Sequence, residues 1–367
     1  MIVMNLILDN FFSFHDFHIN MAYPKRIVNS SIEKEYLDDR PNFRYKKLVI
    51  LMGENASGKT TLGRALMGIF TFITNKIPDP LLACICDKAR EASFSIEFVA
   101  NTKTLYRVEA TIRPTGTDSY REEDIDLVVK SVPITKQDSY ETCVRRLDDL
   151  ESKEISYIEA LEDVERFGWL FSYPNPENTI KTAKILDRGK FLSTLEIVLS
   201  ALDPSVQEVR EGTDIVGSYV IKLSGHDLIL KDEQVLNDSM LSSGTKSGID
   251  IAIMLTSMIT CRNGFYYCDE KFSYIHSDME KEILAKMVEK LGNDGQLFFT
   301  THNTDILDMT LPKHSFVFLK KERVGEHFKV RCVYADTYLK RNTDSLRRAV
   351  ENDLFSIAPN VNRIDQL

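Results

Sequence analysis

The residues best suited to chemistry lie in a glycine-rich string, "GENASGKT", at positions 53–60. The string fits the pattern G-x-x-x-x-G-K-[ST]. It follows an apolar run at 47–52, which predicts a buried strand, and it precedes helical apolar spacing from Lys59 onward. Glycines let backbone N–H groups turn inward around phosphate oxygens, and the start of a helix favours negative charge. This order of strand, loop and helix predicts a nucleotide site.

Two side chains of the loop have separate expected roles. Lys59 would neutralise the β- and γ-phosphates of ATP, and the Thr60 hydroxyl would bind Mg²⁺. The string also occurs by chance, but the flanking elements favour the functional interpretation. The expected nucleotide contacts in the loop are Gly53, Glu54, Asn55, Ala56, Ser57, Gly58, Lys59, Thr60 and Thr61.

Two adjacent carboxylates end the apolar run "FYYCDE" at residues 265–270. Successive side chains of a strand point to opposite sides, so two acids at a strand end can divide their work between metal and water. We expect Asp269 to bind Mg²⁺ and Glu270 to act as the general base on the attacking water. Acidic pairs are common at strand ends, and the upstream loop is what makes this pair informative.

A histidine ends a third apolar run, "FFTTHN", at residues 298–303. A single histidine is usually an ordinary polar residue. The carboxyl ends of parallel strands, however, meet at one edge of a sheet, where ligands bind. We therefore expect His302 to lie beside Lys59, Asp269 and Glu270 and to sense the γ-phosphate.

A second turn rich in serine and glycine, "LSSGTKSG" at 241–248, precedes an apolar helical pattern. The N–H groups at a helix start and a serine hydroxyl can bind an anion. Ser243 and Gly244 are the candidate residues, with Ser242 and Lys246 nearby. The alternative is a polar turn with no ligand.

The remaining patterns indicate mixed α and β structure. Apolar alternation with turn residues between the segments predicts strands at 2–8, 12–19, 92–99, 104–113, 125–132, 215–223 and 227–230. Apolar residues at helical spacing predict helices at 190–201, 247–260 and 279–291. Residues 138–166 carry ten acidic and four basic residues, which indicates a solvated helical insertion more than a site for a basic partner.

Composition limits the class of protein. The chain has 367 residues, 43% of them hydrophobic, and this is enough for one large domain or two modest ones. A net charge of −9 argues against a generally basic nucleic-acid-binding surface. The six cysteines show no C-x-x-C spacing, and no run of 18 apolar residues or signal-peptide pattern occurs. We expect a cytoplasmic protein with no membrane association.

The order of these motifs resembles the ABC-type ATPases, in which Walker A, signature, Walker B and His-switch follow one another. The signature "LSSGT" differs from the transporter form "LSGGQ", and the start "NLILDNFFSFHDFHI" resembles the "NF-x-SF" opening of SMC-like heads. "DEKFSYIHSD" is similar to the bacterial OLD-like, or "AAA family ATPase", group, with Ser273 to His276 at the D-loop. The implied fold is α/β: an ABC-type, SMC-like P-loop ATPase head with a mixed central sheet, an antiparallel β subdomain and a helical lobe.

The resemblance also implies partners and roles. In this family the signature of one subunit caps the γ-phosphate held by another, so Ser243 and Gly244 would act across a homodimer or higher homo-oligomer joined by ATP. A Q-loop glutamine that contacts ATP and Mg²⁺ should lie between Walker A and the signature, and Gln137 is the candidate. The implied segments are residues 1–137 and 190–334 for the two halves of the head, 138–189 for the acidic helical insertion and 335–367 for a helical tail.

Two departures narrow the implied biology. Only the short acidic insertion stands where SMC proteins have a long coiled coil, and the residues after His302 show no acidic cluster like that of the Toprim domain of OLD nucleases, so we do not expect nuclease activity in this chain. With these two departures, the chain resembles ATPases of bacterial anti-phage defence, of the abortive-infection type. Such ATPases control a separately encoded nuclease or toxin. The alternative is a DNA-binding repair or recombination ATPase of the RecF or SMC kind, for which the basic cluster at 339–348 is a candidate contact. A P-loop fold without catalysis is disfavoured, because every expected catalytic residue type is present.

Overall fold

A six-stranded sheet crosses the molecule in the strand order β17-β16-β5-β15-β14-β9. The computed structural model describes residues 1–356 except 29, 118, 152–154, 175–186, 213–217, 232–233, 236–241, 326 and 342–343. The strands are β5 (Leu48–Met52), β9 (Trp169–Ser172), β14 (Phe265–Asp269), β15 (Gln296–Thr300), β16 (Phe316–Val324) and β17 (His327–Tyr334). Five of them run parallel, and β17 pairs antiparallel with β16 at one edge. Their carboxyl ends therefore share one edge of the sheet.

Both faces of this sheet are covered. Val49, Leu51 and Tyr267 point into one apolar cluster, which also contains residues of α1 (Lys59–Asn75). Their neighbours Ile50 and Tyr266 point into the other cluster, which contains residues of α5 (Arg188–Leu202), α6 (Ser243–Ile259) and α7 (Ser277–Lys290). Burial on both sides explains why β5, β14 and β15 read as nearly continuous apolar runs.

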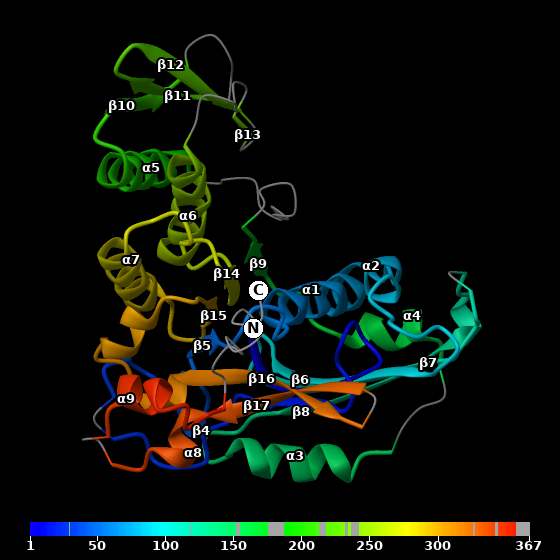
Figure 1. Ribbon diagram of the computed structural model, residues 1–367. Helices are drawn as coiled ribbons and strands as arrows, with labels where there is room; N and C mark the ends of the chain where they lie inside the picture. Colours follow the sequence, from blue (N-terminus) through cyan, green and yellow to red (C-terminus); the bar gives the residue numbers. More distant parts are fainter. Residues whose placement is uncertain are drawn as a thin grey trace, which may run out of the picture.

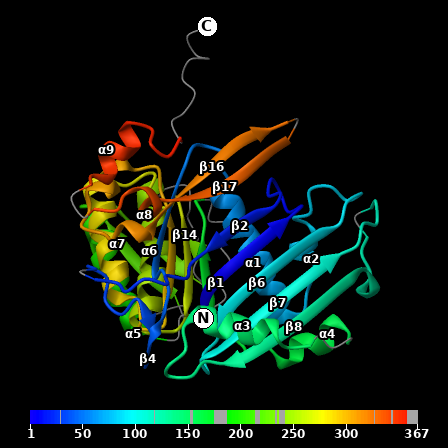
Figure 2. The ribbon, with the colours of Figure 1, turned by 90° about the horizontal axis from the view of Figure 1, so that it is seen from below.

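An antiparallel sheet with the order β2-β1-β6-β7-β8 packs beside α1 (Figure 1). Its strands are β1 (Ile2–Asp9), β2 (Phe17–Asn20), β6 (Ala92–Val99), β7 (Thr104–Ile112) and β8 (Ile125–Pro133). The meander expected from alternation is confirmed. Viewed from below, β1, β6, β7 and β8 lie side by side and α3 (Tyr140–Asp148) lies against the sheet (Figure 2). The second predicted strand is shorter than expected, because Phe12 and Asp16 adopt left-handed backbone conformations.

A helical lobe lies at the end of the molecule away from the five-stranded antiparallel sheet. In this lobe a small antiparallel sheet lies next to α5 and α6 (Figure 1). That sheet contains β10 (Val206–Glu211), β11 (Ser218–Leu223), β12 (His226–Lys231) and β13 (Gln234–Val235). A Cβ atom on Gly248 would come within 2.8 Å of Leu202 and 2.9 Å of Leu199. Glycine at this position thus lets α6 pack closely on α5.

Shorter elements complete the described chain. They are β3 (Tyr36–Leu37), β4 (Arg40–Arg44), α2 (Asp79–Leu82), α4 (Tyr157–Ala160), α8 (Ala335–Tyr338), α9 (Leu346–Glu351) and the 3₁₀ turns η1 (Glu122–Asp124), η2 (Leu161–Asp163), η5 (Thr304–Asp308) and η6 (Lys313–Ser315). Among the described residues, no helix combines the length and the apolar character needed to cross a membrane.

The expected fold class is confirmed, with two differences in detail. The stretch 138–189 is more than a helical insertion, because its residues 169–172 form β9 and pair with β14 of the central sheet. The helix after the signature turn begins at Ser243 and not at 247, because the Ser242 hydroxyl caps it by accepting the Thr245 N–H at 3.1 Å.

Candidate nucleotide site

The loop 53–58 follows β5 and leads into α1. Its glycines have positive φ angles, which other residues rarely adopt. Gly53 and Gly58 have φ angles of 154° and 107°. A Cβ atom on Gly53 would also lie 2.5 Å from the Leu319 carbonyl oxygen. The aromatic ring of Phe14 lies 3.2 Å from the position that a Gly58 Cβ would take. Phe14 of the N-terminal segment therefore packs against the loop.

Lys59 is buried inside this loop. Its Nζ donates to the carbonyl oxygens of Gly53 at 3.0 Å and Glu54 at 3.2 Å, and it lies 3.4 Å from Glu270 Oε1. Burial lowers the pKa of Lys59, and the nearby Glu270 carboxylate opposes that change. The ammonium group is thus held where a phosphate on the loop would meet it.

Asp269 is fully buried at the end of β14. Its Oδ1 accepts the Thr300 hydroxyl at 2.7 Å, while its Oδ2 has no hydrogen-bond partner in the described part of the chain. Burial raises the pKa of Asp269, and the nearby hydroxyls of Thr60 and Thr300 partly offset this rise. Mg²⁺ prefers hard oxygen ligands, and a buried carboxylate oxygen without a partner calls for such an ion or another donor. The Asp269 carboxylate and the nearby threonine hydroxyl supply two oxygens of this kind. The residues at this position therefore fit the metal.

Glu270 and His302 meet in front of Lys59. His302 Nε2 lies 2.8 Å from Glu270 Oε1, so one carboxylate oxygen contacts both the imidazole and the ammonium group. The hydrogen bond with His302 lowers the pKa of Glu270, against the effect of burial, and keeps the group ionised. Glu270 has a left-handed backbone with φ of 43°, and its N–H donates to Thr300 Oγ1 at 2.9 Å. This strained residue is thus fixed by its neighbouring strand.

A buried glutamate on α7 holds the segment that carries His302. Glu280 Oε1 accepts the Thr301 hydroxyl at 2.7 Å, and Oε2 accepts the Asn303 amide at 2.7 Å. The same amide donates to Ser277 Oγ at 2.9 Å. Burial raises the pKa of Glu280, whereas these two donors lower it. The sequence analysis did not identify Glu280; its only signal was an acid on the buried face of a predicted helix.

A cavity of about 320 Å³ lies beside these groups. Its lining includes Glu270, Phe272, Ser273 and Ile275 after β14, Ser277 and Glu280 of α7, and Thr301, His302 and Asn303 after β15. The expected D-loop segment, residues 273–276, is thus adjacent to the general-base candidate.

The signature residues lie at the start of α6. Ser243 is exposed, and the position of a Gly244 Cβ lies 3.5 Å from the Tyr274 carbonyl oxygen. Gly244 therefore lies next to the segment that follows Glu270. Among the described hydrogen bonds and ion pairs, none joins Ser243 or Gly244 to the loop at 53–60.

The structure does not bring Gln137 to this site. It lies in an exposed turn after β8, where its backbone carbonyl oxygen accepts the Asn42 amide at 3.4 Å. Residues at the end of β9 share the edge of Asp269 instead, because Ser172 is in register with Cys268. The hydroxyls of Ser172 and Tyr173 are buried and have no hydrogen-bond partner among the residues that the structure describes. The segment "FSY" contains no glutamine, so residue type gave no signal for this position.

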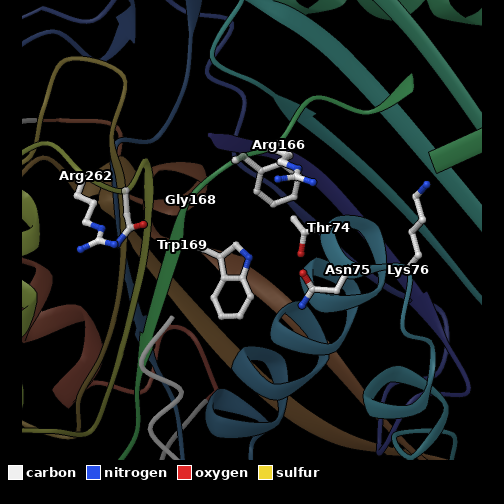
Figure 3. A pocket seen from close by; sticks show the side chains of 9 residues that line it. Thr74, Asn75, Lys76, Arg166, Gly168, Trp169 and Arg262 are labelled. Atoms are coloured by element: carbon white, nitrogen blue, oxygen red, sulfur yellow. The ribbon is translucent and has the colours of Figure 1, made fainter. Parts of the chain in front are cut away.

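A second hollow, of about 800 Å³, lies at the opposite edge of the central sheet. Figure 3 shows Trp169 in it, between Arg262 on one side and Arg166 and Lys76 on the other. Lys76 pairs with Glu162 at 3.1 Å. This hollow is next to the start of β9 and the end of α1, so it contains none of the expected nucleotide contacts.

The fold and the site together define a P-loop ATPase fold of the SMC-head type. An SMC head bound to the C-winged helix domain of ScpA is 13% identical, covers 92% of this chain and 100% of its own, and superposes with a TM-score of 0.53. An SMC head from Pyrococcus furiosus, bound to the C-terminal domain of ScpA, is 11% identical over 92% of this chain and 98% of its own, also with a TM-score of 0.53. These likenesses establish the fold.

The family follows from the sequence match. A family model described as "AAA domain, putative AbiEii toxin, Type IV TA system" matches residues 48–308. The chain belongs to this family. No curated protein sequence matches the chain.

Proposed function

We propose that this protein binds and hydrolyses ATP, and that nucleotide controls the association of two copies of the chain. The observation that supports this most directly is the position of the Glu270 carboxylate, which contacts both Lys59 and His302 beside the buried Asp269. A base, a phosphate-binding cation and a metal-binding carboxylate then share one edge of the sheet.

The proposed chemistry assigns one task to each side chain. Lys59 binds the β- and γ-phosphates in place of the Glu270 carboxylate. Glu270, freed from Lys59, accepts a proton as water attacks the γ-phosphorus, and the bond from that phosphorus to the bridging oxygen breaks to release ADP. His302 orients Glu270 through their hydrogen bond. Thr60 and Asp269 would hold Mg²⁺, which neutralises charge on the phosphates when bound.

The second copy would supply the signature. Ser243 is exposed at the start of a helix of 17 residues, where N–H groups and the helix dipole favour a phosphate. None of the described hydrogen bonds or ion pairs joins it to the phosphate loop of its own chain. A homodimer in which each signature caps the other chain's γ-phosphate would close on ATP and reopen after hydrolysis.

The proposed biological role is regulation within a defence system of the abortive-infection type. The description of the family, which names a toxin and a type IV toxin–antitoxin system, supports this role. In this proposal the protein is cytoplasmic and its dimer controls a separately encoded nuclease or toxin. A repair ATPase that binds DNA is the alternative outcome of the test below.

The test of hydrolysis compares wild type with Glu270→Gln. The substitution keeps the size of the side chain but removes the base, so we expect the rate to fall by about 10²–10⁴-fold while ATP still binds. Glu289→Gln is the matched control, because that glutamate is exposed and pairs with the surface residues Lys286 and Lys290. Hydrolysis at the wild-type rate by Glu270→Gln would refute the assignment of the base.

The test of role uses the same variant as bait. Tagged Glu270→Gln protein, purified from its native host with ATP and Mg²⁺, should carry a stoichiometric second protein that mass spectrometry identifies as a nuclease or toxin. Copurified nucleic acid without a protein partner would overturn the regulatory role and favour DNA repair.

A further inference from the structure

A buried lysine follows the general-base candidate directly. Lys271 is 3% exposed, and its Nζ forms an ion pair with Asp250 of α6, which is itself 6% exposed. The same Nζ donates to the Tyr173 carbonyl oxygen at 2.8 Å, just beyond the end of β9. A lysine is almost never this deeply buried without a partner, and such a pair is costly to desolvate. The nucleotide chemistry proposed above does not use either residue.

The two partners of Lys271 belong to elements that the nucleotide cycle would move. Asp250 lies seven residues after Ser243, two helical turns along the same face of α6. Tyr173 begins the connection from β9 into the helical lobe that contains α5 and α6. Lys271 therefore joins the end of β14, the signature helix and the entrance to the helical lobe at one ammonium group.

The segment that follows Glu270 also lies next to the signature turn. Tyr274, four residues after Glu270, has its carbonyl oxygen 3.5 Å from the position of a Gly244 Cβ. Within the segment, Ser273 Oγ donates to the Glu270 carbonyl oxygen at 2.8 Å. A displacement of α6 would thus reach the Glu270 backbone by two routes, through the buried ion pair and through the turn at Tyr274.

Glu270 is sensitive to such a displacement because its backbone is strained. A left-handed glutamate persists only where its surroundings impose that conformation. On one side, Thr300 accepts the Glu270 N–H. On the other side, the next residue is Lys271, whose ammonium group is anchored on α6.

We propose that Lys271 is a positioning residue that couples Glu270 to the signature helix. When the signature of α6 binds a phosphate across the dimer, the Lys271–Asp250 pair carries the movement of α6 to the Glu270 backbone and brings the carboxylate into line with the attacking water. This inference rests on the proposed function, since it assigns the coupling to ATP hydrolysis.

The test separates coupling from stability with a double substitution. Lys271→Met alone leaves Asp250 buried without its cation and should lower the melting temperature. Lys271→Met/Asp250→Leu removes both charges, and apolar replacement of a buried pair often restores stability. We expect the double variant to melt near wild type and bind ATP with unchanged affinity, yet to hydrolyse it at least about tenfold more slowly, because small misplacements of a catalytic group are costly.

The control is a buried pair that does not touch the site. Arg107 and Glu97 pair on the antiparallel sheet, and both are largely buried. Arg107→Met/Glu97→Leu should leave the rate of hydrolysis unchanged. If Lys271→Met/Asp250→Leu is as stable and as active as wild type, the pair is only structural and the inference is wrong.

Hydrogen exchange distinguishes failure of this inference from failure of the proposed function. In protein without nucleotide, peptides that span residues 270–276 should exchange faster in the Lys271→Met/Asp250→Leu variant than in wild type or in the control. Faster exchange with no hydrolysis by wild type would refute the proposed ATPase, while the structural link between the buried pair and the segment at 270–276 would stand. Unchanged exchange in the double variant would refute the coupling whatever the rate of hydrolysis.

Discussion

Replacing Glu280 by alanine tests whether α7 positions the His302 segment. The change removes a carboxylate that accepts hydrogen bonds from Thr301 and Asn303, both at 2.7 Å. A hydrogen bond to a charged group contributes about 1.5–3 kcal/mol, so the pair would give roughly 3–6 kcal/mol. Burial, which raises the pKa of Glu280, shows that the carboxylate is costly to desolvate, and this cost reduces the expected net loss to about 2–4 kcal/mol.

The same change should slow hydrolysis. Without Glu280, Thr301 and Asn303 lose the hydrogen bonds that join them to this carboxylate, and His302 no longer holds Glu270 in one orientation. We expect the rate constant for hydrolysis to fall by about 10–100-fold, with ATP affinity nearly unchanged because Lys59 is not involved.

The assay combines thermal denaturation with steady-state hydrolysis. Glu282→Ala is the matched control, since that glutamate is on the same helix and exposed. Glu280→Gln should be intermediate, because its amide retains one acceptor oxygen. A folded Glu280→Ala variant that hydrolyses ATP at the wild-type rate would refute the positioning argument.

Two further predictions concern packing and charge. A Cβ atom on Gly63 would lie 2.6 Å from the Tyr267 ring, and the Tyr267 hydroxyl donates to the Lys59 carbonyl oxygen. Gly63→Ala should therefore destabilise the protein by about 1–3 kcal/mol and weaken ATP binding. An unchanged melting temperature would contradict this prediction. Burial lowers the pKa of Lys46 to about 8 from 10.5 in the unfolded chain. As the pH rises, the folded protein therefore loses the Lys46 proton at a lower pH than the unfolded chain does. Between pH 8 and 10.5 the free energy of unfolding of wild type should increase, relative to that of Lys46→Met, by at most about 3 kcal/mol. Denaturation of both proteins at pH 7.5 and 10 measures this difference, and a constant difference would show that Lys46 is not desolvated.

Motif spacing predicted the core of the site because local patterns determine it. Strands buried on both faces give apolar runs, and each of the runs before Gly53, Glu270 and His302 is a parallel strand of the central sheet. Parallel strands present their carboxyl ends at one edge, which is how residues separated by more than 200 positions could be predicted to lie together.

The features that the sequence did not reveal depend on pairing between distant segments. The four-residue strand β9 follows an acidic stretch, and only its contact with β14 makes it part of the sheet. Gln137 was chosen by residue type, whereas the fold places the turn that contains it beside Asn42. The hydrogen bonds of Glu280 and the ion pair of Lys271 join residues whose spacing follows no helical or strand period.

The most direct measurement of the central claim is complementation between two inactive variants. Lys59→Ala should abolish ATP binding, and Ser243→Arg should block the phosphate contact made across the dimer. In an equal mixture, half of the dimers are mixed and half of their sites are intact, so the account predicts recovery of about a quarter of wild-type hydrolysis. No recovery from two folded variants that associate with each other would contradict a site shared between two copies.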